Sequence, residues 1–468
     1  MSSGDEKKSA THAMQPAAFK KTNTVMKLPV ELLCIILDMS DPRPAYREWK
    51  KYIVHLEAEN DEYGTCRTPE REPPPAPTHY PHHLARVCQR WNDILAGLPS
   101  RWANPIVFLD HDLEETLADL KMSFRFSQDL PLDLVVDYTM KTEKAEVDAY
   151  CDIEPSRSRA VIKVLSPHFQ RCRNITFETM LGMSLPSPSK DLSGVSSTLR
   201  SLTLRCKYDF HHPTDILFGA DPAPIPDRAD CKLTNLNELY LSGYTIIDAC
   251  RNAPHLIQAA QSTLTLRDFI ASDEETAEQI VPYFLKALSR ERRRRGEIAL
   301  YNIDLPLWEP DALLDEPFYI QNRTTLTDLR YKTMCNILDF VDFQHAGDLT
   351  IKRCPLPEEA SRIGAVHYLH LNEITNCEAN LADMLLEWDG LHLSITQGDP
   401  LDDLLRMLAS RRRRGDCYMD ELELDCCGMF TIDAMKTLCE SRTPSDMSLM
   451  YSIEVTGIGP VILKEERQ

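Results

Sequence analysis

The chain has 468 residues, a length that suggests two or three domains or one elongated repeat array. Hydrophobic residues make up 43% and charged residues 26%, a composition typical of a folded protein. Its formal net charge of −20 argues against general affinity for nucleic-acid phosphate or anionic lipid. The N-terminal residues lack the apolar core of a secretory signal, and no apolar stretch approaches the roughly 20 residues of a membrane span. We therefore expect an intracellular protein, cytoplasmic or nuclear, whose 15 cysteines are reduced and pack as small apolar residues.

Residues 1–25 are polar and lack a helical period, which predicts a disordered tail. The pattern changes at Leu28, where the sequence LPVELLCIIL begins. Pro29 suits the first turn of a helix because its missing N–H would have no partner there, and Glu31 suits the positive N-terminal end. This segment predicts a short helix with too many apolar faces to stand alone.

A second helical segment, LARVCQRWNDIL, begins at Leu84. Its apolar residues recur at intervals of three and four, as on one face of a helix: Leu84, Val87, Cys88, Trp91, Ile94 and Leu95. Gly97 is a typical helix stop. Trp102 lies just beyond, where it could close a small helical core from the far side.

Residues 41–83 form an insertion between the two helical segments. Its first half predicts an accessory helix, because apolar residues recur with helical spacing at Tyr46, Trp49, Ile53 and Leu56. Its second half contains PPPAP, which we interpret as an extended spacer rather than a ligand for an SH3 or WW domain. His82 and His83 end the insertion and are expected to be exposed.

From residue 104 onward, short apolar segments of strand character recur, with alternate residues expected to point inward. Their leading interior residues are Leu202, Leu239, Leu264, Ile298, Leu349, Leu369, Leu391 and Leu422. A weaker segment around Leu326 fills the widest gap. The other spacings run from 20 residues (349 to 369) to 37 (202 to 239), whereas leucine-rich repeats have periods of 20–29. The repeats must therefore be irregular.

Two amphipathic helix candidates between these strands end in the same way. Arg292–Arg295 precede Gly296, and Arg411–Arg414 precede Gly415. Cations suit a helix C-terminus and glycine suits its cap, so we interpret both runs as solvated helix ends rather than nuclear-import or nucleic-acid patches. Two copies of one construction favour a strand–helix repeat. Residues 104–462 are thus predicted to be an α/β domain with a curved, largely parallel sheet, followed by a tail over 463–468.

The two helical segments together resemble an F-box, whose pattern pairs an LPxE–L–I–L motif with a later L–V–C–W–I motif and an aromatic residue. The matching positions are Leu28, Pro29, Glu31, Leu32, Ile35, Leu84, Val87, Cys88, Arg90, Trp91, Ile94 and Trp102. The layout, with repeats after the motif, is similar to large F-box families of mushroom-type fungi. The long insertion departs from the F-box pattern, although a loop insertion costs little closure entropy.

The resemblance implies an all-α F-box over residues 26–103, followed by an irregular leucine-rich-repeat-like solenoid. It further implies a substrate-recognition subunit of a Skp–cullin–F-box ubiquitin ligase, monomeric outside the complex, that brings an unknown protein substrate near the ubiquitin donor. A Skp-type adaptor would bind Leu28, Pro29, Glu31, Leu32, Ile35, Ile36, Leu84, Val87, Cys88, Trp91, Ile94 and Trp102. The alternative is that residues 28–102 only cap the open end of the repeat core.

No catalytic signature is found: the sequence contains no GxGxxG, P-loop, GxSxG or HExxH motif. The tightest cysteine cluster, Cys417, Cys426 and Cys427, has no CxxC pair and no zinc-finger histidine, so we expect buried packing. We predict no enzyme, cofactor or metal site. Two alternatives to the ligase hypothesis stay open. One is a repeat scaffold outside any ligase, and the other is an enzyme whose site no motif marks, with clustered pKa-shifted groups in a deep pocket.

Overall fold

The computed structural model describes residues 28–50, 52–53, 74, 77, 79–138, 153–192, 197–208, 233–271, 277–289, 296–309, 318–320, 323–343, 346–357, 363, 366–374, 381–386, 388–396, 401–414, 419, 421–425, 431–441 and 455–456. Both predicted tails, most of the Pro-rich spacer, Arg292–Arg295 and the cluster of Cys417, Cys426 and Cys427 lie outside these residues. The chain divides into two compact units, 1–97 and 98–468. The domain boundary expected after residue 103 lies close to this division.

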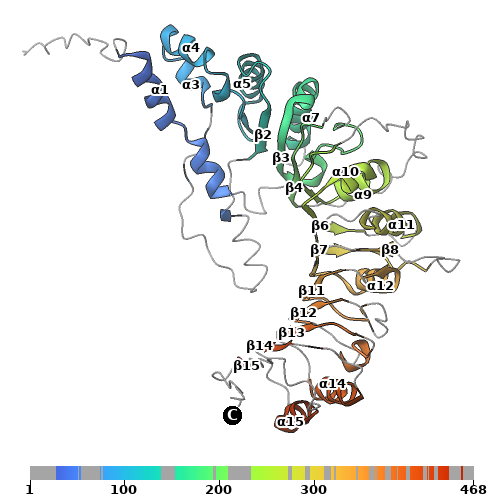
Figure 1. Cartoon of the computed structure of the whole chain (residues 1–468). Coiled ribbons are helices and arrows are strands. Elements are labelled where there is room, and N and C mark those ends of the chain that lie inside the picture. Colours follow the sequence, from blue (N-terminus) through green and yellow to red (C-terminus); the bar gives the residue numbers. More distant parts are fainter. Residues whose placement is uncertain are drawn as a thin grey trace, which may run out of the picture. The chain divides into compact units, whose positions relative to one another are not determined.

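The described part of the first unit is helical. Helix α1 spans Val30–Met39, residues 43–50 are helical, α3 spans His82–Ala85 and α4 spans Gln89–Ala96 (Figure 1). Gly97 caps α4, and its backbone N–H donates to Asp93 O at 3.2 Å and Ile94 O at 3.1 Å. The helix at 43–50 confirms the accessory helix over the part of it that the structure describes.

The second helical segment is not one continuous face. α3 ends at Ala85, and Cys88 has extended backbone angles, φ −166° and ψ 165°, before α4 begins at Gln89. The 3.6-residue period is lost across an extended residue, so the regular spacing from Leu84 to Leu95 does not place these side chains on one face. The prediction of a single apolar face was therefore wrong here.

The second unit is built on a 13-stranded parallel sheet whose neighbours follow chain order, which confirms the predicted α/β class and largely parallel sheet. Its strands are β1 Ile106–Phe108, β2 Leu132–Asp137, β3 Cys172–Leu181, β4 Ser201–Tyr208, β5 Glu238–Ser242, β6 Thr263–Ile270, β7 Glu297–Asp304, β9 Arg323–Thr327, β11 Asp348–Lys352, β12 Tyr368–Asn372, β13 His392–Thr396, β14 Glu421–Asp425 and β15 Val455–Thr456. A separate parallel pair joins β8 (Phe318–Tyr319) to β10 (Val341–Asp342).

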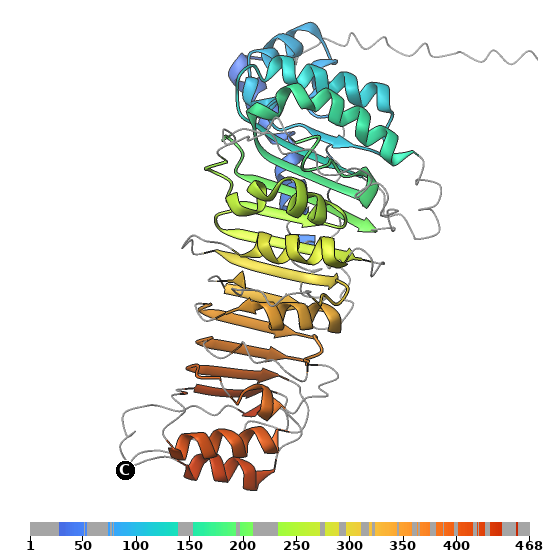
Figure 2. The ribbon, with the colours of Figure 1, turned by 90° about the vertical axis from the view of Figure 1, so that its right-hand side faces the viewer.

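The helices of the second unit lie along one face of this sheet (Figures 1 and 2). They are α5 Leu113–Phe126, α7 Glu154–Leu165, α9 Thr245–Asn252, α10 Pro254–Ala259, α11 Ala277–Leu288, α12 Tyr331–Phe340, α13 Leu381–Met384, α14 Asp402–Arg414 and α15 Ile432–Glu440, with 3-10 turns η2 Pro99–Arg101, η3 Ser166–Arg171 and η4 Gly182–Ser184. None of the described helices combines the length and apolarity needed to cross a bilayer.

The core follows from strand alternation. Paired interior residues run across the sheet in one row: Leu202, Leu239, Leu264, Ile298, Thr324, Leu349, Leu369, Leu393 and Leu422. All are at most 2% exposed. The sequence placed Leu391 in this row, but Leu369 pairs with Leu393. Leu391 and Leu393 have the same alternation phase, so only the pairing between strands distinguishes them.

A residue with left-handed backbone angles lies at or near the carboxyl end of six strands: it directly follows β5, β9, β11 and β12, and it lies two residues before the end of β6 and β7. The residue two positions after the second interior apolar residue has a positive φ in each case: Gly243 (57°), Asp268 (55°), Asn302 (47°), Asp328 (54°), Arg353 (49°) and Glu373 (51°). The N–H of Asp328 donates to Lys352 O at 3.0 Å, and that of Arg353 donates to Asn372 O at 2.9 Å. Glycine, Asp and Asn adopt this conformation readily, whereas Arg and Glu are strained in it.

An ion-pair ladder accompanies the two strained turns. Arg353 Nε donates to Asp328 Oδ1 at 2.7 Å, and Arg353 Nη1 lies 3.7 Å from Glu373 Oε2. The Arg353 side chain is 18% exposed. These contacts between successive turns help to offset the backbone strain at Arg353 and Glu373.

Candidate partner-binding surface

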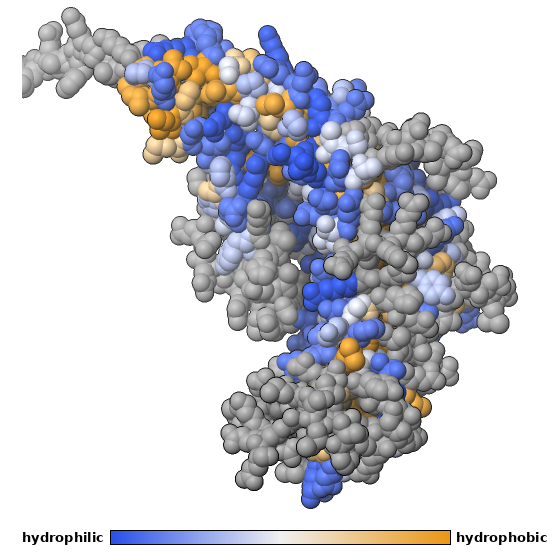
Figure 3. Space-filling model, in the orientation of Figure 1, coloured by the Kyte–Doolittle hydropathy of each residue, from blue (hydrophilic) through white to orange (hydrophobic). Residues whose placement is uncertain are grey.

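Helix α1 presents an apolar face to solvent. The exposed fraction is 45% for Leu32, 52% for Ile35, 39% for Ile36 and 83% for Met39. These residues follow the i, i+3, i+4, i+7 spacing of one helix face. Figure 3 shows hydrophobic residues gathered over the α1 region. We call these four residues the α1 face.

Helix α1 is packed against the rest of the first unit on the side opposite the α1 face, so the exposure of the α1 face does not mean that the helix is unpacked. Leu33 and Leu37 are each 1% exposed and point to that other side. Full burial of such a side chain contributes about 1.5–3 kcal/mol, so covering the half-exposed members of the α1 face would add roughly 1 kcal/mol per residue. A contiguous apolar surface of this kind is typical of an interaction site.

Two hydrogen bonds join the helical segments that the insertion separates in sequence. Arg90 Nη2 donates to Leu28 O at 2.6 Å, just before α1, and Tyr80 Oη donates to Leu37 O at 3.1 Å, near its end. The Arg43 guanidinium lies 4.5 Å from the centre of the Tyr80 ring. Burial raises the pKa of Tyr80 to about 12, so its hydroxyl remains a donor at neutral pH. α1 is thus held at both ends.

His82 is buried rather than exposed, contrary to the sequence-based expectation. It is the first residue of α3 and is 4% exposed because its ring packs inside the fold, whereas His83 remains on the surface. Burial, together with the nearby positive charge of Arg86, lowers the pKa of His82 to about 3. His82 is therefore neutral at physiological pH and belongs to the core of the first unit.

The remaining predicted adaptor contacts have diverse surroundings. Pro29 and Glu31 are exposed, Val87 is 60% exposed between α3 and α4, and half-buried positions are occupied by Leu28, Leu84, Cys88, Trp91 and Ile94. Trp102 differs: it is fully buried in the second unit, with its ring centre 4.8 Å from that of Phe126. It supports a core there and offers no surface to a partner.

Sequence reasoning missed Met39, the most exposed apolar residue of α1. The signal was present, because Met39 lies seven residues after Leu32 and four after Ile35. Its flexible thioether side chain suits an interface that adapts to a partner.

The face of the sheet opposite the helices is polar. Four of its central positions, on paired or nearby strands, are threonines: Thr203, Thr265, Thr325 and Thr350. Larger side chains flank them, including Tyr301, whose ring centre lies 5.7 Å from the Arg267 guanidinium. Tyrosine and arginine are enriched where proteins bind proteins.

Histidines and carboxylates follow on β11–β14. The ring centres of His370 and His392 lie 5.2 Å apart. His370 Nε2 is 3.6 Å from Asp348 Oδ1, and His392 Nε2 is 3.9 Å from Glu423 Oε2. Burial lowers the pKa of His370, against the opposing pull of Asp348. This end of the sheet therefore presents imidazole and carboxylate groups, which can form hydrogen bonds and ion pairs with a partner.

The buried cysteines among the described residues are not expected to be reactive. Cys172 and Cys354 are fully buried, and burial raises the pKa of each to about 12, which keeps the thiols protonated. Cys206, Cys250 and Cys335 are also buried. The expectation that cysteines pack as small apolar residues is confirmed for these five.

Comparisons with known proteins identify no relative: no family model matches the chain, and no curated protein or solved structure matches it significantly. Function is therefore inferred from the chain's own residues.

Proposed function

We propose that the chain is an F-box protein that acts as a substrate-recognition subunit of a Skp–cullin–F-box ubiquitin ligase. The observation that carries this proposal is the exposed α1 face, because three of its four residues fall within the segment Leu28–Leu37 that resembles the first half of an F-box. The joining of α1 to residues around Tyr80 and Arg90 supports it further, since an F-box needs both halves together despite the insertion.

The second unit is proposed to be an irregular leucine-rich-repeat solenoid. Its paired interior positions after Ile298 are separated by 26 residues to 324, 25 to 349, 20 to 369, 24 to 393 and 29 to 422. All five spacings fall within the 20–29 range of such repeats. The wider earlier spacings include segments outside the described residues.

One repeat fits the LxxLxLxxCxL pattern closely, with fully buried residues at each apolar position: Ala346, Leu349, Ile351, Cys354 and Leu356. Cys354 Sγ donates to Lys352 O at 3.1 Å and accepts from Leu329 N at 3.4 Å. The turns between strands leave backbone N–H and C=O groups without strand partners. A side chain at this repeat position can satisfy them by hydrogen bonding to the backbone of its own turn and of the preceding one.

In this proposal the chain performs no catalysis. The first unit would hold a Skp-type adaptor, and the polar face of the sheet would hold a protein substrate. Tethering raises the effective concentration of substrate lysines near the ubiquitin donor, to the millimolar range for short linkers. The α1 face supplies apolar contact area, and the Thr, Tyr, Arg and His side chains of the sheet supply directional contacts.

The test is a binding assay between a purified Skp-type adaptor and the full chain. The double change Ile35→Asp with Ile36→Asp should weaken adaptor binding at least a hundredfold, because it places two charges in the apolar contact. Ile270→Asp is the matched control, since Ile270 is 45% exposed and lies in the second unit. Equal binding by the wild type and the double variant would refute the assignment of the α1 face.

A repeat scaffold outside any ligase is the second candidate, supported by the continuous polar face of the sheet. It predicts a stable monomeric chain for which even the wild type binds no adaptor. If residues 28–102 only cap the repeat core, the Ile35→Asp and Ile36→Asp changes would lower the stability of the second unit. Hydrogen exchange of its strands would detect that loss.

A further inference from the structure

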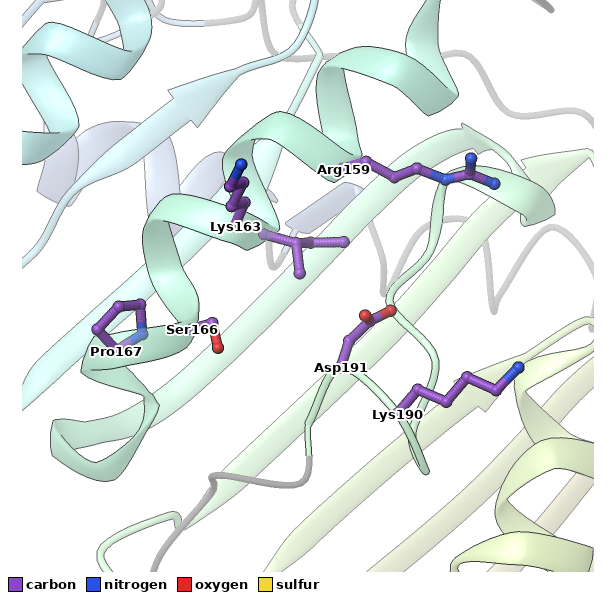
Figure 4. Close-up of a pocket in the computed structure, with 7 residues that line it drawn as sticks. Arg159, Lys163, Ser166, Pro167, Lys190 and Asp191 are labelled. Atoms are coloured by element: carbon purple, nitrogen blue, oxygen red, sulfur yellow. The ribbon is translucent and has the colours of Figure 1, made fainter. Parts of the chain in front are cut away.

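A basic pocket lies on the helix-covered side of the second unit, on residues that the proposed function does not use. Its volume is about 330 Å³, and it is lined by Arg159, Ile162, Lys163, Ser166, Pro167, Lys190 and Asp191. Figure 4 shows that Arg159 and Lys163 extend from α7, while Lys190 and Asp191 lie on the facing loop. Arg159, Lys163 and Ser166 follow i, i+4, i+7 spacing, so they share one side of α7 and its 3-10 continuation.

The cations of this pocket are not used by the fold. Within the described residues, the side chains of Arg159, Lys163 and Lys190 form no hydrogen bond or ion pair, in a chain whose net charge is −20. Arg157, on the same helix, shows the contrast: its Nη1 donates to Leu109 O at 2.8 Å and to His111 O at 3.0 Å. Arg157 supports the fold, whereas Arg159 faces the pocket.

One wall of the pocket is fixed by a buried carboxylate. Glu154, at the start of α7, is 3% exposed and accepts from Met180 N at 2.7 Å and from Leu181 N at 3.0 Å. Ser184 Oγ donates to the same carboxylate at 2.9 Å. These bonds attach α7 to the end of β3 and to η4, so the helix that carries Arg159 and Lys163 has a defined position.

A second buried carboxylate fixes the facing loop. Asp248 of α9 is 4% exposed and accepts from Ser187 Oγ at 2.7 Å and from Ser189 Oγ at 2.6 Å. Tyr244 Oη donates to Leu185 O at 2.6 Å on the same loop. The loop that carries Lys190 is therefore preorganised, which lowers the entropy that a ligand would have to remove.

We propose that this pocket binds a phosphomonoester dianion. Three cations and the single carboxylate of Asp191, which accepts from Ser187 N at 2.7 Å, leave an excess of two positive charges. A phosphate monoester carries −1.5 to −2 charges at pH 7, so it matches this excess better than a monoanion does. The Ser166 hydroxyl offers a hydrogen bond, and the apolar Ile162 and Pro167 suit the organic part of the ester. The pocket does not depend on adaptor binding.

The test uses isothermal titration calorimetry on the full chain at constant ionic strength set with chloride. The probes are phenyl phosphate, inorganic phosphate and phenyl sulfonate. Phenyl phosphate should bind more tightly than phenyl sulfonate, and its affinity should fall below about pH 6 as the dianion takes up a proton and becomes a monoanion. Equal affinity for phenyl phosphate and phenyl sulfonate, or binding that chloride alone abolishes, would overturn the proposal.

Variants then locate the site. Arg159→Glu with Lys163→Glu should weaken phenyl phosphate binding about tenfold or more, because two exposed attractive contacts are reversed in sign. Lys121→Glu is the matched control, since Lys121 is exposed on α5 and outside the pocket. Undiminished binding by the double variant would place the anion elsewhere and refute this site. If the double variant fails to fold, Lys190→Gln gives the same test from the other wall.

The probes also separate two sources of the phosphate group. Tighter binding of phenyl phosphate than of inorganic phosphate would assign the pocket to an organic ester, with Ile162 and Pro167 contacting the organic part. Equal affinity for the two would overturn the assignment to an ester and would make free phosphate the ligand of the pocket.

Discussion

The two units of this chain use their apolar residues in opposite ways. The first unit leaves Leu32, Ile35 and Met39 exposed on one short helix. The second buries the repeated apolar positions of its sheet and presents threonine, tyrosine, arginine and histidine at the alternate positions, on the face opposite the helices. The difference follows from size, because the short helices of the first unit cannot bury every apolar side that they present, whereas each strand of a long array covers its neighbour. An apolar face contributes affinity but distinguishes poorly between binding partners, whereas the charged and hydrogen-bonding groups of a polar face select among them.

Truncation in the sheet core should produce the largest effect and sharpen this contrast. Leu300→Ala removes a side chain that is 1% exposed and packed in the main core, so we expect a loss of about 3 kcal/mol in the free energy of unfolding. Urea unfolding followed by circular dichroism measures it. Leu32→Ala in the first unit is the comparison, and a similar loss from that exposed position would break the contrast.

Acid should destabilise the first unit through His82. The pKa of His82 is lowered to about 3 in the folded state, against an ordinary value of 6.5, because burial disfavours its charged form. Its contribution to stability is therefore complete above pH 6.5 and is lost as the pH falls toward 3. At pH 5 the loss is about 2 kcal/mol. Hydrogen exchange of α1 and α3 amides would measure it.

The control for this pH dependence is His82→Phe, which cannot take up a proton. Its first unit should show a smaller loss of protection between pH 7 and pH 5 than the wild type. An identical pH response in both proteins would assign the acid sensitivity to other groups.

Loss of a buried arginine contact should have the next largest effect. Arg411 was expected to be a solvated helix end, but it is 7% exposed and its Nη1 donates to Leu385 O at 3.1 Å and Trp388 O at 2.6 Å. Arg411→Met keeps the aliphatic volume and leaves these carbonyls without that donor, so we expect a loss of about 1–2 kcal/mol. Denaturant unfolding checks this. Arg406→Met, on the exposed side of the same helix, should change stability by less than about 0.5 kcal/mol.

The smallest stability effect is expected on the α1 face. Ile35→Ser alters a side chain that is 52% exposed, so the free energy of unfolding should change by less than about 1 kcal/mol. Adaptor binding should nevertheless weaken about tenfold, because an apolar contact is removed from the interface. Thermal unfolding and a binding titration on the same protein separate the two quantities. A large fall in melting temperature would mean that Ile35 supports the fold.

The sequence was sufficient to predict an element wherever the two-residue period of a strand or the 3.6-residue period of a helix was clear. Alternating apolar residues located strands such as β6 and β12, and even the weak segment around Leu326 forms β9. The cluster of apolar residues after Pro29 located α1 in the same way. These predictions succeeded because strand alternation and helix periodicity are properties of neighbouring residues.

Contacts between distant residues decided what the sequence left open. The break at Cys88, the burial of His82 and the pairing of Leu393 rather than Leu391 each depend on partners far along the chain. The apolar α1 segment was evident from sequence alone, but which of its residues face outward depended on Leu33 and Leu37 packing inward. The basic pocket had no sequence signal, because Lys163 and Lys190 belong to different elements that the buried Glu154 and Asp248 hold in place. Sequence thus determined the elements and their apolar sides, while tertiary packing determined which side chains remain available to a partner, since exposure is a property of the assembled fold.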